Sequence, residues 1–187
     1  MSATPDLFGT TVVPGLALGE AIVTAREEAR LIAHIDAAGL SPFRFQQWTG
    51  KRLTRSFGWT YDFEKGRFAP ADPIPPWLLA VKDRAAKFAG LDPAMLVQAL
   101  VIRYDPGAGI GWHKDRPVFD HVVGISLGAA AAMRLRRRSS TGFERASVPL
   151  APRSIYHLAG EVRHDWEHSL APLGALRWSI TFRSLAA

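Results

Sequence analysis

Residues 109–117, GIGWHKDRP, place a histidine and an aspartate two positions apart behind a pair of glycines. In an extended strand, side chains two residues apart point the same way, so His113 and Asp115 could bind one metal ion from one short segment. The pair is a weak signal alone, because two polar residues on a wet loop give the same pattern. Such a site needs a further ligand from elsewhere in the chain.

Two histidines and one carboxylate form the facial triad of non-haem Fe(II) oxygenases, which leaves three coordination positions open for substrate and oxygen. The chain contains no cysteine, so thiol nucleophiles, disulfides and zinc-cysteine clusters are excluded and any metal must use histidine and carboxylate. Spacing alone does not choose the remaining ligand. The candidates are His121, His157, His164 and His168. His157 in SIYHL is better interpreted as a hydrogen-bonded core residue, and His164 is expected in a loop near the metal.

The segment RWSITFR, residues 177–183, has the alternation of a strand with two different faces. One face carries Arg177, Ser179, Thr181 and Arg183, and the other carries Trp178, Ile180 and Phe182. A simple amphipathic strand also explains this pattern. Inside a sandwich, however, the arginines need an anionic companion, because an unpaired buried guanidinium is very unfavourable. A dicarboxylate held by a fork-shaped cation would meet that need.

Taken together, these residues resemble the AlkB family of Fe(II)- and 2-oxoglutarate-dependent dioxygenases. The resemblance covers residues 96–183, from RYDPGAGIGWHKD through WEHSL to RWSITFR. It implies that His113, Asp115 and His168 ligate Fe(II). It also implies that Arg177 forms a salt bridge to the distal carboxylate of 2-oxoglutarate, and that Tyr104, Ser179 and Arg183 lie around this cosubstrate.

The resemblance further implies an activity: with O₂, oxidative demethylation of alkylated nucleobases in DNA or RNA, releasing succinate, CO₂ and formaldehyde. A base inside a duplex cannot reach such a site, so it would be flipped out or taken from a single strand. Two departures bear on this expectation. Ile102 stands where the family often has an asparagine that contacts the cosubstrate, and Arg116 and Pro117 stand where better-known members carry an acidic residue near the target base.

Several elements must position these residues. Helical spacing of apolar residues predicts a first helix over Thr24–Ala38, and PPWLLAVKDRAAKFAGLDP predicts a second that ends at Gly90. Short apolar or alternating runs then follow, divided by Gly, Pro or Ser, as is typical of a sandwich or barrel. The prediction is a mainly β fold with flanking α-helices, helices first and strands after. The resemblance makes it a double-stranded β-helix (jelly-roll) core with N-terminal helices and a nucleotide-recognition lid.

The length of 187 residues suits one domain, 1–187, with residues 1–20 as a loose lead-in and 96–183 as the catalytic β core. Residues 44–64 mix aromatic and basic side chains and form the predicted substrate lid. The candidates are Trp48, Lys51, Arg52, Arg55, Phe57, Trp59 and Tyr61. The alternation of Phe57, Trp59, Tyr61 and Phe63 on one side of a strand leaves a second interpretation open, namely packing into the core.

The net charge of +6 favours a polyanionic partner, and five arginines lie within residues 133–145. That run is either a solvated strand face or a phosphate-contacting patch. The sequence has no signal peptide pattern and no long apolar run, so we expect a cytoplasmic monomer with alkylated DNA or RNA as its partner and no membrane. Two alternatives stay open: an oxygenase of this class that acts on a protein or small molecule, and a non-catalytic basic β domain that binds nucleic acid.

Overall fold

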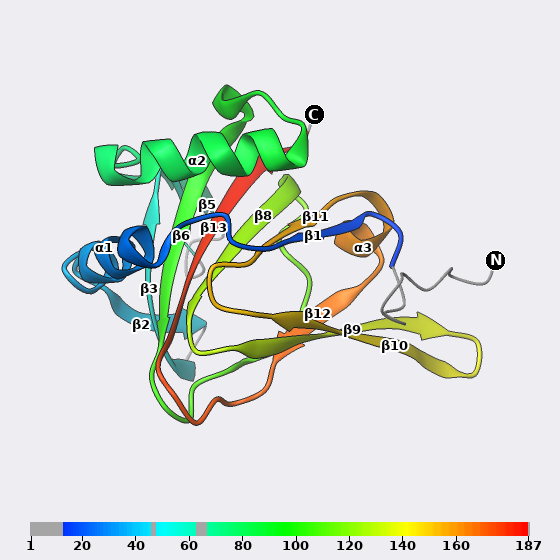
Figure 1. The fold of residues 1–187 in the computed structure, drawn as a ribbon. Coiled ribbons are helices and arrows are strands. Elements are labelled where there is room, and N and C mark those ends of the chain that lie inside the picture. Colours follow the sequence, from blue (N-terminus) through cyan, green and yellow to red (C-terminus); the bar gives the residue numbers. More distant parts are fainter. Residues whose placement is uncertain (1–12, 46–47, 63–66, 187) are drawn as a thin grey trace.

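Two facing antiparallel sheets form the body of the protein (Figure 1). The computed structural model describes residues 13–45, 48–62 and 67–186. The larger sheet contains, in spatial order, β1 (Leu16–Gly19), β11 (Ile155–Leu158), β8 (Phe119–Gly128), β13 (Arg177–Leu185), β6 (Leu96–Tyr104), β3 (Trp48–Phe57) and β2 (Ser41–Phe45). The smaller sheet contains β10 (Gly142–Leu150), β9 (Ala131–Ser139), β12 (Glu167–Leu170) and β7 (Ile110–His113). Strands β4 (Trp59–Asp62) and β5 (Arg67–Pro70) form a separate hairpin. This is the predicted jelly-roll core.

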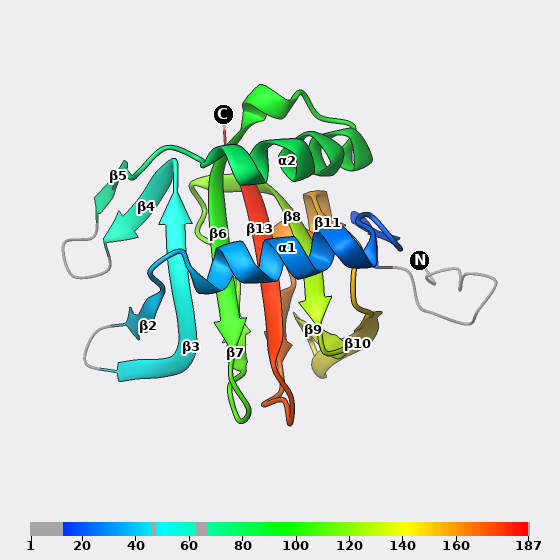
Figure 2. The ribbon, with the colours of Figure 1, turned by 60° about the vertical axis from the view of Figure 1, so that its left-hand side comes forward.

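Two helices cover the outer face of the larger sheet (Figure 2). Helix α1 (Ala25–Asp36) begins at a capping box in which Thr24 and Glu27 satisfy each other's backbone N–H groups. Helix α2 (Pro76–Ala89) ends at Gly90, whose φ of +68° favours glycine. Both predicted helices are confirmed; the short α3 (Gly160–His164) and a 3₁₀ turn at Pro93–Met95 were not foreseen. None of the helices in the described ranges has the length and apolar character needed to cross a bilayer.

The alternation of β13 divides the interior into two parts, as predicted. Trp178, Ile180 and Phe182 pack with the helices in one apolar core. Arg177, Ser179, Thr181 and Arg183 point the other way and line a cavity between the two sheets. The same strand therefore closes a dry core on one side and supplies polar groups on the other.

The N-terminal third differs from the prediction of helices followed by strands. Residues 1–12 lie outside the described part, but Leu16–Gly19 is no loose lead-in, because it forms β1 and pairs with β11. Strand β3 pairs with β6, so the larger sheet includes a strand that precedes the predicted β core of residues 96–183. The prediction that Phe57 and Trp59 alternate along one continuous strand is wrong. Gly58, with φ +76°, ends β3, and a separate strand, β4, begins at Trp59.

Candidate active site

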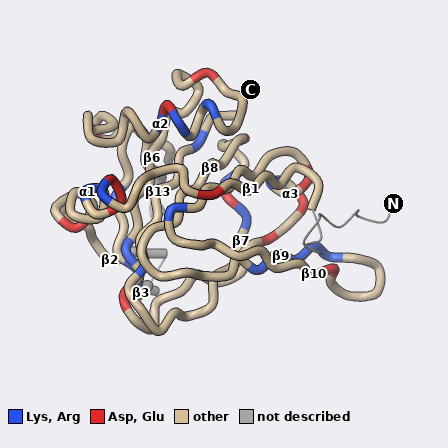
Figure 3. Tube along the Cα trace, in the orientation of Figure 1, with Lys and Arg blue, Asp and Glu red and all other residues tan. Residues whose placement is uncertain are grey.

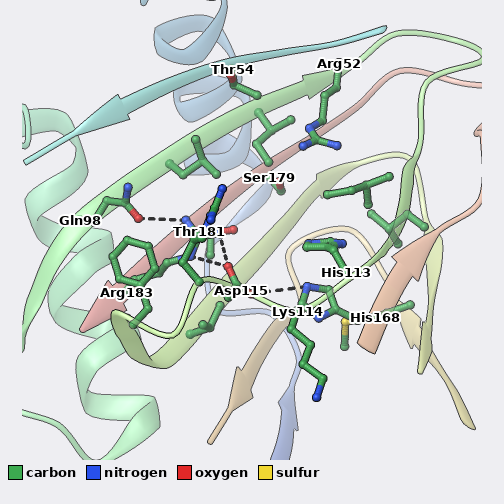
Figure 4. A pocket seen from close by; sticks show the side chains of 18 of the residues that line it. Arg52, Thr54, Gln98, His113, Lys114, Asp115, His168, Ser179, Thr181 and Arg183 are labelled. Atoms are coloured by element: carbon green, nitrogen blue, oxygen red, sulfur yellow. Dashed lines mark hydrogen bonds and ion pairs between the residues drawn. The ribbon is translucent and has the colours of Figure 1, made fainter. Parts of the chain in front are cut away.

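Three side chains with metal-binding atoms converge at one end of the cavity (Figure 4). His113 ends β7 and lies directly opposite His168 of β12 in the strand register. Asp115 follows β7, so it reaches the site from the segment after the strand and not from the strand itself. The ligand atoms of these residues all lie within 4.8 Å of one another.

None of the other candidate histidines is part of this ligand group, although His164 lines the same cavity. Nδ1 of His121 is 2.9 Å from Nε2 of His157, a buried residue of β11, so the interpretation of His157 as a hydrogen-bonded core residue is confirmed. His164 ends α3, and its Nε2 lies 3.1 Å from Oδ1 of Asp120. Among the described residues, only His168 completes the group.

The two histidines are held in the form that binds a metal. Nδ1 of His113 donates to the carbonyl oxygen of Gly111 at 2.8 Å, which leaves the lone pair of Nε2 available to coordinate a metal ion. Burial, together with the neighbouring His113, lowers the pKa of His168 to about 3. Burial also lowers the pKa of His113. Both rings are therefore neutral at physiological pH, as a metal ligand must be.

Asp115 is the matching anion. Burial raises its pKa, but the positive charge of Arg183, with smaller electrostatic contributions from His168, His113 and Arg163, outweighs burial and holds the pKa below its ordinary value. Nε and Nη2 of Arg183 lie 2.7 and 2.6 Å from Oδ1, whereas Oδ2 is buried without a hydrogen-bond partner. Two neutral imidazoles and one free carboxylate oxygen fit a divalent ion such as Fe(II).

The cavity behind these ligands has a volume of about 1210 Å³ and is lined from both sheets. Arg177 lines it from β13 and is only 1% exposed. Its Nε donates to Oγ of Ser126 at 3.2 Å and its guanidinium carbon lies 5.0 Å from the centre of the Tyr104 ring, while its Nη1 is buried without a partner. A buried cation with an unused donor fits the carboxylate of a bound diacid. Ser179 and Thr181 line the same cavity beside it.

Tyr156 of β11 shapes the cavity through a close approach to the backbone. Its half-buried ring lies over Gly124 of β8, where a Cβ atom would come within 2.1 Å of the ring. Only glycine leaves room for the ring at this place. Ile102 lines the cavity beside Ser179, its neighbour in the strand register, and offers no hydrogen bond where the family often has an asparagine.

Two polar residues of the site were not predicted. Gln98 of β6 accepts from Nη1 of Arg183 at 3.0 Å and so fixes the guanidinium that holds Asp115. The sequence did contain a clue to Gln98, because it is the one amide in the apolar run LVQAL. It lies an even number of residues from Tyr104, so both side chains are expected on the same face of the strand. Arg163 of α3 is buried near Asp115 and donates to the carbonyl oxygens of Arg116 and Phe119. No sequence pattern marks it, because its position depends on how α3 packs.

The predicted lid residues divide between two faces of β3. Arg52 lines the cavity together with Thr54 and Ser56, and Lys51 is exposed. The expectation is wrong for Arg55 and Phe57. Arg55 binds the carbonyl oxygen of Ala38 and the carboxylate of Asp72 instead, and Phe57 packs in the core against Trp77.

Strand β4 contains the remaining lid candidates beyond Gly58. Trp59 stacks on Phe68 of β5 with ring centres 4.8 Å apart, and Phe68 meets Phe119 edge-on at 5.5 Å. Phe119 lies under the guanidinium of Arg183, so this aromatic row extends from the hairpin to the candidate site. The side chains of Trp48 and Tyr61 lie outside the described part of the chain.

Comparisons with known proteins agree with this geometry. Residues 16–183 match the sequence profile of the 2OG-Fe(II) oxygenase superfamily. The chain is 26% identical over 166 residues to the mouse (Mus musculus) tRNA (carboxymethyluridine(34)-5-O)-methyltransferase ALKBH8, covering 85% of this chain and 24% of that protein. It is 28% identical over 185 residues to the alkylated DNA repair protein ALKBH8 homolog of Arabidopsis thaliana, covering 83% of this chain and 50% of that protein.

A solved structure, titled the structure of OsALKBH1, shares the fold with a TM-score of 0.67 at 16% identity, covering 92% of this chain and 98% of the other. The chain spans about a quarter of the length of the mammalian ALKBH8 proteins it matches.

Proposed function

Because the chain belongs to the 2OG-Fe(II) oxygenase superfamily and is similar to its AlkB-like members, we propose that it oxidises an alkylated base of a nucleic acid. One observation carries the oxygenase part of this proposal. A triad of two neutral histidines and one charged aspartate shares a cavity with Arg177, whose guanidinium has a buried donor without a partner.

The residues of the chain bind and orient the reactants. His113, Asp115 and His168 would hold Fe(II), and Arg183 would keep Oδ2 of Asp115 directed at it by occupying Oδ1. Arg177 would bind the distal carboxylate of 2-oxoglutarate, with Tyr104 and Ser179 beside it. When bound, iron with 2-oxoglutarate and O₂ supplies oxidation of a C–H bond, with succinate and CO₂ as coproducts. The sheets bury Asp115 and half-bury the two histidines, which limits the water that can compete with the substrate.

Three features support a nucleic-acid base as the target. The cavity is large enough for a cosubstrate and a flat ring, and its lining includes the cations Arg52, Lys114 and Arg116. The net charge of +6 draws a polyanion toward the protein. The names of both relatives given above refer to tRNA or to alkylated DNA. On an N-methylated base, hydroxylation of the methyl group is followed by its loss as formaldehyde, which restores the base.

The test is turnover of 2-oxoglutarate by the Fe(II)-loaded chain, with and without oligonucleotides that carry N-methylated bases. We expect succinate formation that these oligonucleotides stimulate, with formaldehyde released in equal amount. Succinate formation that no RNA or DNA stimulates would move the target to a protein or small molecule. Nucleic-acid binding without any succinate, and unchanged by His113→Ala, would identify a non-catalytic binding domain.

A further inference from the structure

A group of arginines and aromatic rings covers the outer face of the smaller sheet and reaches the edge of the cavity at Trp112. We call it the outer arginine face; it consists of Arg134, Arg136 and Arg138 of β9, Phe143 and Arg145 of β10, and Trp112 of β7. The alternate residues Met133 and Leu135 are buried in the core between the sheets. In Figure 3, blue segments mark the basic residues of β9 and its neighbour β10.

The charge of this face is mostly uncompensated. Arg136 forms an ion pair with Glu167 of β12 at 2.6 Å. Within the described ranges, Arg134, Arg138 and Arg145 have no carboxylate at ion-pair distance. Arg137, on the other side of β9, shows the contrast, because Glu144 and Glu161 each lie 2.7 Å from its guanidinium. The carboxylates therefore neutralise one side of the strand and leave the other cationic.

Aromatic rings hold these guanidinium groups in place. The guanidinium carbon of Arg136 lies 4.4 Å from the ring centre of Trp112 and 4.6 Å from that of Phe143. Arg138 and Arg145 each lie 5.5 Å from the centre of Phe143. A stacked guanidinium keeps its N–H edge free and has less freedom to lose, so it binds phosphate at a lower entropic penalty than a mobile side chain.

The outer arginine face is continuous with the candidate site. Strands β7 and β12 carry His113 and His168 toward the cavity, and Trp112, which stacks with Arg136, is also among the residues that line the cavity. We propose that this face binds the phosphodiester backbone of the nucleic-acid strand whose base enters the cavity. The proposal rests on the function proposed above. Arginines at alternate positions of one strand, roughly 7 Å apart, offer a regular row of donors that suits a regular row of phosphates.

The experiment compares two double variants of the full chain that remove the same charge. Arg138→Gln/Arg145→Gln changes the outer arginine face, and Arg26→Gln/Arg30→Gln changes exposed positions of α1 on the opposite side of the larger sheet. All four side chains are exposed, and matching urea unfolding curves would establish that both variants are folded. The dissociation constant for a labelled single-stranded oligonucleotide with an N-methylated base, as RNA and as DNA, is then measured at several salt concentrations.

We expect the first variant to weaken binding about tenfold and to reduce the slope of log K against log salt by about 1.4, the value for two lost phosphate contacts on a single strand. The control variant should keep the wild-type slope. Equal shifts in both variants would overturn the inference, because they would reflect net charge alone. Competition by poly-glutamate as strong as that by the oligonucleotide would also overturn it in favour of an acidic protein. Failure of the wild type to bind or oxidise any oligonucleotide would instead contradict the proposed function itself.

Discussion

Strands β13 and β9 each carry arginines on one of their two faces, and the two sets of arginines lie in opposite surroundings. On β13, Arg177 and Arg183 are enclosed in the cavity and contact Ser126, Gln98 and Asp115. On β9, Arg134, Arg136 and Arg138 lie on the outer surface, where aromatic rings hold them. The alternation of two faces along a strand therefore places arginines in an enclosed interior in one sheet and on a charged exterior in the other.

This difference follows from what each strand packs against. Strand β13 is central in the larger sheet and is covered by helices on one face and by the cavity on the other, so its polar face has to lie inside. Strand β9 has its one apolar face between the sheets, so its arginine face is left to solvent. Buried ion pairs depend on each partner, whereas exposed pairs are screened by water and contribute little. Substitutions should separate the two strands accordingly.

The largest expected effect is at the centre of the buried network. Asp115→Ala removes a ligand and the anion that Arg183 and Arg163 face, so we expect the chain to lose Fe(II) binding and at least about 100-fold in 2-oxoglutarate turnover. Metal titration and succinate formation measure these two losses. Near-wild-type turnover in this variant would contradict the assignment of the metal ligands.

Arg183→Met should have the next largest effect, mainly on the free energy of unfolding. It leaves the carboxylate of Asp115 buried without its cation, which destabilises proteins by about 3–5 kcal/mol. Urea unfolding of the metal-free protein measures the change. A loss below about 1 kcal/mol would mean that Asp115 is well compensated without Arg183.

Arg177→Met sharpens the comparison within β13. The KM for 2-oxoglutarate should increase roughly 30-fold or more, since loss of a buried charge partner weakens binding by about 2–5 kcal/mol. Stability without cosubstrate should stay unchanged or increase, because the variant removes a buried donor that has no partner. Equal destabilisation by Arg177→Met and Arg183→Met would contradict the distinction between a ligand-binding and a structural arginine.

The free energy of unfolding of the metal-free protein should also depend on pH. We expect this effect to be smaller than that of Arg183→Met, because water that enters the cavity can hydrate the histidine rings. The pKa of His168 is about 3 in the folded chain and near 6.5 in the unfolded chain. Between these values the unfolded chain binds more protons, so stability is complete above pH 6.5 and falls as the pH is lowered toward 3. Urea unfolding at pH 7.5, 6 and 5 should show this decline, and it should be weaker in His168→Gln.

The smallest effect is expected on β9. Arg136→Gln breaks a partly exposed surface pair with Glu167, and we expect a loss of at most about 1 kcal/mol with unchanged metal affinity. Thermal unfolding and metal titration test both. A loss as large as that of Arg183→Met would remove the contrast between the two strands.

The sequence predicted those parts of the site that depend on local periodicity. The two faces of RWSITFR and the capped helix after Thr24 followed from residue spacing, and the choice of His168 came from a resemblance in motif. The lid prediction was wrong at Arg55 and Phe57, because the odd-numbered residues at this end of β3 face the helices and not the cavity. The strand then ends at Gly58. Arg163 could not be found, since it becomes part of the site only when α3 packs against the segment after β7.

The contact of Tyr156 with Gly124 has a consequence for cosubstrate choice. The phenol ring occupies the space that any other residue at position 124 would fill, and its neighbours in the cavity include Arg177. An added methyl group there would push the ring forward and shorten the room available to a diacid. Under the function proposed above, we therefore expect Gly124→Ala to favour shorter keto acids, which makes this position a handle for redesigning cosubstrate choice.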